Sequence, residues 1–249
     1  MSTMEKIGLY PFTVQPYQVD FQQKITLMGL GHYLLESAGI HADQREFGLR
    51  DLLKRGKGWF LTRLAIQMDA YPLQYEKIWI ETWVKEVGDV FTSRNFHVLN
   101  ASKEVIGGAS SSWAMIDLRT RRPEFLKNQL GTEHVAGDKP SLLEATEKVP
   151  PLQPEATERS RYRVAYSDLD IMRHVNSIRY IQWMLDLFPL SLFEEKHVSR
   201  LDINYMAETV FGQEVEFRFE PRTPGQEYLI EIGKAEEGGP VCRGRVRWA

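Results

Sequence analysis

The hydrophobic and polar positions of this chain follow the same order twice. A strand-like YQVDF at Tyr17–Phe21 leads into an apolar helical pattern that runs through Ala38, and YRVAY at Tyr162–Tyr166 leads into another that runs through Phe188. Stretches of period two follow each helical pattern, and the clearest is EVEFRFE at Glu214–Glu220. The pattern predicts two copies of one unit, each with a strand, a helix and about four further strands.

A direct alignment supports this duplication. Thr62–Thr82 and Ser199–Phe219 align without a gap, and each half closes on similar residues, SWA and RWA. Between the halves, residues 131–158 are poor in strand pattern and rich in Pro, Glu and Thr, which is typical of a linker. We therefore expect an N-terminal domain at residues 1–130, a linker at 131–158 and a C-terminal domain at 159–249.

The second helical pattern, from Asn176 to Phe188, has polar residues only at Arg179, Gln182 and Asp186. These lie three and four residues apart, so they form one narrow stripe on a helix that is otherwise apolar. Such a helix is buried on most sides, and a curved antiparallel sheet wrapped around it would supply that burial. Pro189 is expected to end the helix.

Composition and charge exclude several classes of protein. The 249 residues are 43% hydrophobic and 26% charged, and the net charge of -3 indicates neither nucleic acid nor an anionic membrane as a partner. One cysteine, Cys242, allows no internal disulfide, which fits a reducing compartment. The first residues lack the apolar core of a signal peptide, and no window approaches a membrane span. These features favour the cytoplasm, and that of a bacterium, because no transit peptide is seen. A trimmed organellar protein is the alternative, since its sequence would look the same.

The entrance of the second helix is rich in acid-base groups. Asp170, His174 and Asn176 lie just before its first turn or within it. A helix N-terminus carries partial positive charge and can bind a carbonyl oxygen that becomes an oxyanion. A carboxylate there can activate water or attack directly, and a histidine can orient water or donate a proton. The combination suits hydrolysis of an activated acyl group.

Aspartate and asparagine before a helix are also ordinary N-caps. One cap is enough for a helix start, however, and this entrance has several polar groups. The corresponding segment of the first half, Phe21–Tyr33, contains no aspartate and no His-Val-Asn. We therefore expect one active half and one half that is structural or binds substrate.

These residues carry a resemblance to a known family. DLDIMRHVNSIRYIQW at Asp168–Trp183 is similar to the signature of hotdog-fold thioesterases. Together with RLAIQMDAYP at Arg63–Pro72, IWIETWV at Ile78–Val84 and ASSSWAMIDLRTRRP at Ala109–Pro123, it makes residues 5–249 resemble the acyl-acyl-carrier-protein thioesterases of plants and bacteria. The resemblance implies an α+β double hotdog, in which each repeat is a central helix wrapped by a curved antiparallel sheet.

The resemblance also assigns residues at the helix entrance. Asp170 and His174 match the acidic and histidine positions of the family pattern D-x-N-x-H-V-N, and Asn176 matches its last asparagine. The first asparagine of the pattern falls on Met172, so this chain departs from it and lacks one hydrogen-bond donor.

The family carries a Glu-Cys pair on a strand after the helix, and this pair falls on Glu208 and Thr209, so the glutamate is kept and the cysteine is lost. A cysteine nucleophile is therefore excluded at Thr209, which stays in the expected catalytic set with Asp170, His174, Asn176 and Glu208. Cys242 is expected to be an ordinary core residue. We expect Glu208 to act as general base for water, with Asp170 and His174 positioning it and the thioester. Direct attack by Asp170 to form an anhydride is the second mechanism, and a surface carboxylate is the alternative for Glu208.

The family resemblance implies an apolar tunnel for the acyl chain under the N-terminal helix. Each lining candidate also fits an ordinary core position. The substrate-binding candidates are Met28, Leu30, Leu34, Trp59 and Met68, together with Met172 at the other helix entrance.

Acyl carrier protein is acidic, so its docking surface should be basic. Three groups of basic residues are weak candidates, because each also fits a solvated face. They are Lys54–Lys57, Arg119–Arg122 and the alternating Arg243, Arg245 and Arg247.

No nucleotide-binding motif and no paired CxxC occurs, and the histidines show no ligand-like spacing, so neither a metal nor a cofactor is expected. The expected function is hydrolysis of fatty acyl-carrier-protein thioesters. The alternatives are an acyl-CoA thioesterase, a non-enzymatic acyl-binding protein and, less favoured, a hotdog dehydratase. A monomer and a homodimer both fit, because a double hotdog already pairs two hotdog units in one chain.

Overall fold

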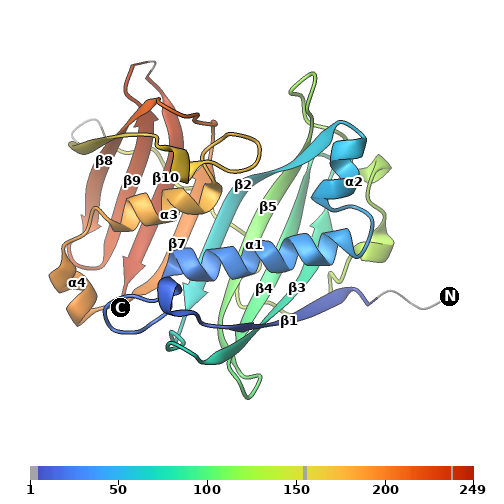
Figure 1. The fold of residues 1–249 in the computed structure, drawn as a ribbon, viewed down its shortest axis with the longest axis horizontal. Coiled ribbons are helices and arrows are strands. Elements are labelled where there is room, and N and C mark those ends of the chain that lie inside the picture. The colour runs from blue at the N-terminus through green and yellow to red at the C-terminus, as the bar shows by residue number, and fades with distance from the viewer. Residues whose placement is uncertain (1–4, 154–155, 237) are drawn as a thin grey trace. The chain divides into compact units, whose positions relative to one another are not determined.

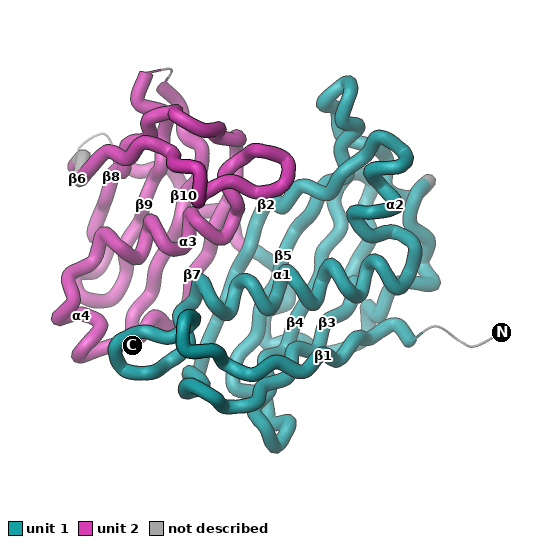
Figure 2. Tube along the Cα trace, in the orientation of Figure 1, with its two compact units in different colours: residues 1–146 teal, residues 147–249 magenta. Residues whose placement is uncertain are grey.

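The computed structural model describes residues 5–153, 156–236 and 238–249 of the chain. The chain divides into two compact units, Met1–Thr146 and Glu147–Ala249 (Figure 2). In each unit a helix lies against a curved antiparallel sheet (Figure 1).

In the first unit, the described residues form a sheet with the strand order β1-β3-β4-β5-β2, and every neighbouring pair is antiparallel. Helix α1 (Leu27–Asp43) begins at Thr26, whose side chain accepts a hydrogen bond from the N–H of Gly29. The short helix α2 (Leu49–Lys54) follows. The strands are β1 (Ile7–Thr13), β2 (Lys57–Met68), β3 (Lys77–Val87), β4 (Phe91–Leu99) and β5 (Val105–Asp117), with 3-10 turns η1 (Pro16–Gln18), η2 (Leu126–Asn128) and η3 (Thr132–His134).

The described part of the second unit has the strand order β7-β10-β9-β8-β6, again antiparallel throughout. Its helices are α3 (Ser177–Leu185) and α4 (Leu190–Glu195), and the 3-10 turn η4 (Tyr166–Asp168) precedes α3. Its strands are β6 (Thr157–Arg163), β7 (Val198–Tyr205), β8 (Glu214–Thr223), β9 (Glu227–Lys234) and β10 (Pro240–Trp248).

The two units have the same topology. Taken in chain order, the strands of the second unit pair in the same sequence as those of the first. Isolated bridges also repeat: Lys24 pairs with Leu73 in the first unit, and His174 pairs with Val210 in the second. The predicted duplication and the α+β double hotdog are thereby confirmed.

The predicted second helix ends earlier than expected. Helix α3 stops at Leu185, and a turn in which the N–H of Phe188 donates to the carbonyl of Leu185 follows. The residue before a proline avoids the helical region, so Phe188 leaves the helix and Pro189 caps α4 instead. Phe188 packs edge-on against Trp248, which buries it.

The segment expected to be a linker, residues 131–158, is anchored to both units where the structure describes it. The buried Asn95 donates from Nδ2 to the carbonyl of Leu143 at 3.0 Å in the first unit. In the second unit, Oδ1 of Asn204 accepts from the N–H of Val149 at 2.8 Å. Leu152 also packs with Val149 in a small apolar cluster. The polar composition of this segment therefore hides apolar residues that pack on each unit.

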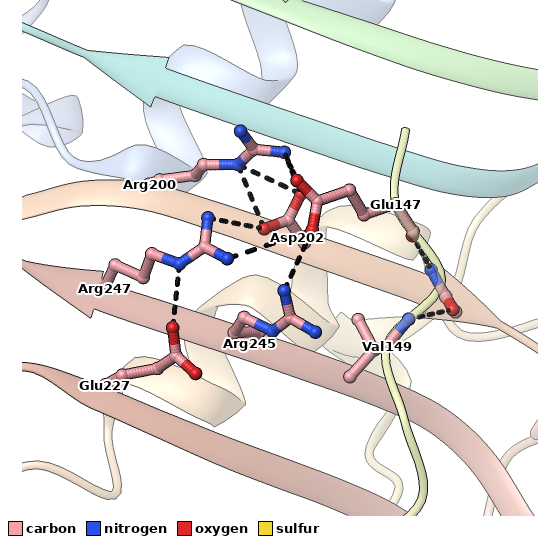
Figure 3. A network of polar contacts seen from close by, with 8 residues as sticks. Glu147, Val149, Arg200, Asp202, Glu227, Arg245 and Arg247 are labelled. Carbon is pink, nitrogen blue, oxygen red and sulfur yellow. Dashed lines mark hydrogen bonds and ion pairs between the residues drawn. The ribbon is translucent and has the colours of Figure 1, made fainter. Parts of the chain in front are cut away.

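The alternating arginines of β10 are ion-paired. Figure 3 shows Arg245 and Arg247 beside the carboxylates of Glu147, Asp202 and Glu227. The carboxylate of Asp202 is 1% exposed. It accepts several hydrogen bonds from Arg200, which completes the network.

Arg243 pairs separately with Glu231 at 2.6 Å. The basic stripe read from the sequence is therefore locally neutralised, which weakens it as a candidate docking surface.

Candidate active site

Two loops of the second unit meet at the start of α3. The N–H of Val175, before the helix, donates to the carbonyl of Thr209, after β7, at 2.9 Å. The neighbouring residues His174 and Val210 form an isolated antiparallel bridge. The hydrogen bond and the bridge bring the side chains of His174 and Glu208 together, with 3.4 Å between Nε2 and Oε2.

The His174–Glu208 pair is partly open to solvent. The two side chains are 25% and 29% exposed. The separation of 3.4 Å is longer than that of a strong hydrogen bond. Glu208 lies in the loop after β7, whereas the family pattern suggested a strand. The loop position turns the carboxylate toward the helix entrance.

Asp170 builds the turn that carries His174. Its Oδ1 accepts hydrogen bonds from the N–H groups of Met172 at 2.8 Å and His174 at 3.1 Å. Its own N–H donates to the carbonyl of His174 at 2.8 Å. Arg173, inside the turn, has a φ of 64°, in the left-handed region. Asp170 therefore positions the backbone of His174.

Asn176 is the N-cap of α3. Its Oδ1 accepts a hydrogen bond from the N–H of Ile178 at 3.0 Å, which leaves the Nδ2 amide as the donor end of the side chain. The other aspartate of the motif, Asp168, is 3% exposed and accepts from the hydroxyl of Tyr162 and the N–H of Ala165, both at 2.8 Å. Asp168 is therefore committed to holding the turn η4.

Thr209 is completely buried and is hydrogen-bonded to Tyr180 of α3, with 2.5 Å between the two hydroxyl oxygens. Burial raises the pKa of the Tyr180 hydroxyl, so it stays neutral. This contact ties the residue after Glu208 to the helix. Cys242 is also buried, and burial raises the pKa of its thiol well above the usual range. It is a buried core residue, as predicted.

Comparison of the two units corrects one expectation. The first unit does contain an equivalent aspartate: Asp20, whose Oδ1 accepts from the N–H groups of Gln22 at 2.8 Å and Lys24 at 3.1 Å. Gln23 has a φ of 62°, like Arg173. The expectation failed because the compared segment began at Phe21, one residue after Asp20. Aspartate at this turn is therefore a requirement of the fold in both units.

Other positions differ between the units. The N–H of Ile25 donates to the carbonyl of Pro72 as that of Val175 does to Thr209. With the shared bridges, this places Lys24 where the second unit has His174, and Tyr71 where it has Glu208. The pair of a histidine and a carboxylate thus occurs at this point of the second unit and is replaced in the first.

Tyr180 was missed by the sequence reasoning. Tyr180 lies ten residues after Asp170, and Leu30 lies ten residues after Asp20. The bond from Ile25 to Pro72 places Pro72 where the second unit has Thr209, so neither partner of the Tyr180–Thr209 hydrogen bond recurs in the first unit. A gapless comparison of both helix entrances would have found it.

The predicted acyl-chain residues are placed as follows. Leu30 and Leu34 of α1 and Met68 of β2 are at most 1% exposed, and Met28 is half-buried. Trp59 lies apart, packed with Ala42 and Phe47 near the C-terminal end of α1, about 18 Å along the helix from Leu30. Met172 belongs to the turn at the entrance of α3 and is 37% exposed. Leu30, Leu34 and Met68 are therefore core positions, whereas Trp59 lies near the other end of α1 and Met172 belongs to the second unit.

Two further findings concern the described residues alone. They contain no group of three or more His, Cys, Asp or Glu side chains that could hold a metal ion. Among them, no helix has the length and apolar character needed to cross a membrane.

The shared turn predicts matched effects on stability. Asp20→Ala and Asp170→Ala each remove the acceptor of two backbone N–H groups, so each should lower the free energy of unfolding by about 1–2 kcal/mol. Urea denaturation measures this. Only Asp170→Ala should also impair hydrolysis, because it displaces His174. A destabilisation seen for Asp170→Ala but absent for Asp20→Ala would contradict the shared role.

Comparison with known proteins identifies the family. The profile of the acyl-ACP thioesterase N-terminal domain matches residues 10–133, and that of the C-terminal domain matches residues 152–249. The crystal structure of an acyl-ACP thioesterase from Bacteroides thetaiotaomicron is 38% identical, with a TM-score of 0.91 and full coverage of both chains. A 12:0-ACP thioesterase from Umbellularia californica, 20% identical, shares the fold with a TM-score of 0.86 over 98% of each chain.

A palmitoyl-acyl carrier protein thioesterase of Gossypium hirsutum is 26% identical over 95% of this chain. The chain spans 62% of the length of that relative. The two matched profiles together cover most of the sequence. The chain belongs to the acyl-ACP thioesterase family.

Proposed function

We propose that this chain hydrolyses fatty acyl thioesters of acyl carrier protein, and that it releases a free fatty acid and the holo carrier protein. The observation that carries the proposal is the His174–Glu208 pair, 3.4 Å apart at the entrance of the buried helix α3. The substrate class is supported by the family and by the 38% identical Bacteroides relative, which is named an acyl-ACP thioesterase.

In the proposed reaction, Glu208 takes a proton from a water molecule as the water oxygen attacks the thioester carbonyl carbon. The tetrahedral intermediate then collapses, and the carbon–sulfur bond breaks. The proton held by Glu208 passes to the leaving sulfur through the imidazole of His174, so the pair regains its starting protonation state. Asp170 holds the backbone of His174 in place, and the Thr209–Tyr180 hydrogen bond holds the loop of Glu208.

The oxyanion needs a hydrogen-bond donor, and we assign this role to Nδ2 of Asn176. Because Oδ1 of Asn176 is fixed by the N–H of Ile178, the orientation of the amide is fixed as well. The equivalent cap in the first unit is Thr26, whose hydroxyl accepts from the N–H of Gly29 and which carries no amide. The choice of asparagine over threonine is therefore explained by chemistry beyond capping.

The acyl chain is proposed to bind beside α1, whose Leu30 and Leu34 are buried and whose Met28 is half-buried, and the buried Met68 of β2 is a further candidate. Every residue assigned to the chemistry lies in the second unit, so the reaction needs no second copy of the chain. Light scattering distinguishes a monomer from a homodimer.

We also propose a bacterial cytoplasmic location, which the likeness to the Bacteroides protein supports over the chloroplast named for the plant relatives. Cell fractionation tests this location.

The function is tested by measuring free-thiol release from acyl carrier protein and CoA thioesters of varied chain length. The wild type should hydrolyse the carrier-protein thioesters, and Glu208→Gln should be slower by ~10²-fold or more, the scale of losing a general base. Glu194→Gln, an exposed residue of α4, is the matched control and should keep full activity.

Each other outcome of this assay has a definite meaning. A wild type that hydrolyses no acyl thioester would overturn the enzyme and leave an acyl-binding protein. Faster hydrolysis of CoA thioesters would indicate an acyl-CoA thioesterase. Full activity of Glu208→Gln would move the chemistry to Asp170.

The role of Asn176 is tested by exchanging the two helix caps. Asn176→Thr keeps a capping oxygen but loses the amide, so kcat should fall by ~10²-fold while the free energy of unfolding changes little. Thr26→Asn is the control and should change neither quantity. Unchanged kcat in Asn176→Thr would show that the amide donates nothing to the reaction.

A further inference from the structure

The first unit holds a buried cluster of basic side chains that the proposed chemistry does not use. Arg94 of β4 and Arg45, which follows α1, are 5% and 7% exposed, and His41 of α1 is completely buried. Nη1 of Arg94 donates to Nδ1 of His41 at 3.1 Å and to the hydroxyl of Thr82 at 3.2 Å. Nη1 of Arg45 donates to the carbonyl of His41 at 2.9 Å. The two guanidinium groups therefore converge on one histidine.

The positive charges of Arg94 and Arg45 lack a negative partner. His41 is neutral, because Nδ1 accepts from Arg94, and burial and the charge of Arg94 lower its pKa to about 3. Burial lowers the pKa of Arg94 to about 9, which leaves its guanidinium group charged at neutral pH. Glu5 offers Arg45 its backbone carbonyl, and among the described residues neither guanidinium group has an ion pair with a carboxylate. A buried charge without a partner lowers the stability of the fold.

Other titratable groups beside the cluster do not supply the missing charge. The hydroxyl of Tyr10 donates to Gln44 at 2.8 Å, and burial raises its pKa. Burial lowers the pKa of His134, so this ring is neutral as well. Glu133 lies 3.6 Å from His134, but its side chain is 70% exposed to solvent. Two buried guanidinium groups thus face one exposed carboxylate, and the cluster keeps an excess of positive charge.

The second unit closes the equivalent place with aromatic side chains. The gap-free alignment of the two units puts Phe219 where the first unit has Thr82. Counting two residues back from the cross-strand partner of each puts Tyr228 where the first unit has Arg94. The rings of Phe219 and Tyr228 are 5.1 Å apart, and both contact Phe188. Apolar packing is therefore sufficient for the fold at this place, and the charged cluster is an addition of the first unit.

The cluster lies at the end of an apolar stripe on α1. Leu30, Leu34, Ser37 and His41 are spaced by three or four residues, so they share one face of the helix. The hydroxyl oxygen of Ser37 is buried and has no hydrogen-bond partner in the described part of the chain, which leaves a donor one turn from His41. The face changes from apolar to polar over about 16 Å.

The inner face of the sheet changes in the same way. Ile80 shares a face of β3 with Thr82, and Phe96 shares a face of β4 with Arg94. Ile80 and Phe96 are completely buried. The interior of the first unit is thus apolar at one end and positively charged at the other, which matches a ligand with an apolar chain and an anionic head.

We propose that Arg94 and Arg45 bind the carboxylate of a free fatty acid whose chain lies beside α1 along Leu34 and Leu30. The carboxylate supplies the missing negative charge and accepts charge-assisted hydrogen bonds from the guanidinium groups. Binding is independent of the proposed function, but one consequence rests on it. The fatty acid would cover the region where the acyl chain of the substrate is proposed to bind, so the product should compete with the substrate.

Isothermal titration calorimetry with decanoate, decanol, acetate and inorganic phosphate tests the proposal. The wild type should bind decanoate about tenfold or more tightly than decanol, the scale of a hydrogen bond to a charged group. Acetate and phosphate carry charge without a chain and should bind more weakly than decanoate. In Arg94→Gln the Kd of decanoate should rise by about tenfold or more, and that of decanol should stay near the wild-type value. Arg50→Gln, which removes an exposed arginine of α2, is the control and should bind decanoate like the wild type.

Carbon-13 NMR of carboxyl-labelled decanoate reads the surroundings of the bound head group. Beside two guanidinium groups, the pKa of the bound acid should lie below that of the same acid bound to Arg94→Gln. A carboxylate bound beside Glu208 instead would have a raised pKa that does not respond to Arg94→Gln, and this result would overturn the proposal.

Two calorimetric results would also overturn it: equal affinity of the wild type for decanoate and decanol, and unchanged affinity of Arg94→Gln for decanoate. The urea midpoint of ligand-free Arg94→Gln should equal or exceed that of the wild type, because the variant removes an unpaired buried charge. A lower midpoint would mean that Arg94 serves the fold, and would contradict the proposal.

If Arg94→Gln does not fold, Arg45→Gln decides by the same comparison of decanoate with decanol. Failure of the proposed function is distinguishable. A wild type that hydrolyses no thioester but binds decanoate through Arg94 leaves the fatty acid site standing, and one that hydrolyses thioesters but does not bind decanoate overturns the site alone.

Discussion

The hydrogen bond from the N–H of Val175 to the carbonyl of Thr209 is the constraint on which the site depends. It joins the loop that enters α3 to the loop that leaves β7, two segments more than thirty residues apart in sequence. Because each loop carries one side chain of the proposed pair beside this bond, the bond determines the distance between His174 and Glu208. The turn built by Asp170 and the buried contact between Thr209 and Tyr180 stiffen the two sides of the same junction.

The duplicated fold separates what the architecture needs from what the chemistry needs. Both units join the same two loops, both use an aspartate to shape the turn, and both cap the helix with a polar side chain. The difference is confined to a few positions. Where the second unit has His174 and Glu208, the first unit has Lys24 and Tyr71. One junction has been kept as structure and the other has been supplied with acid-base groups, which is why the proposed chemistry falls in the second unit.

Much of the fold could be predicted from the sequence, because apolar periodicity reports directly which face of a helix or strand is buried. The repeat, the antiparallel sheets and the buried α3 follow from it. The anchoring of residues 131–158 could not be predicted, because Leu143, Val149 and Leu152 are scattered among polar residues without a period.

The residues of the candidate site were found by their type and spacing, but their arrangement was not. The contact between Tyr180 and Thr209 joins positions 29 residues apart, and no local pattern announces such a pair. The role of Asp170 was also obscured, since a carboxylate that shapes a turn and one that attacks a substrate look alike in sequence. The hydrogen bonds that Oδ1 of Asp170 accepts, which recur at Asp20, show that this carboxylate shapes the turn.

The central claim is that the His174–Glu208 pair activates water, so that no acyl group is transferred to the protein. The most direct measurement is hydrolysis of an acyl carrier protein thioester in oxygen-18 water, followed by mass spectrometry of the fatty acid and of the peptides that contain Asp170 and Glu208. The account predicts heavy oxygen in the released fatty acid and none in either peptide. Heavy oxygen in the carboxylate of Asp170 or Glu208 would reveal an anhydride intermediate and contradict it.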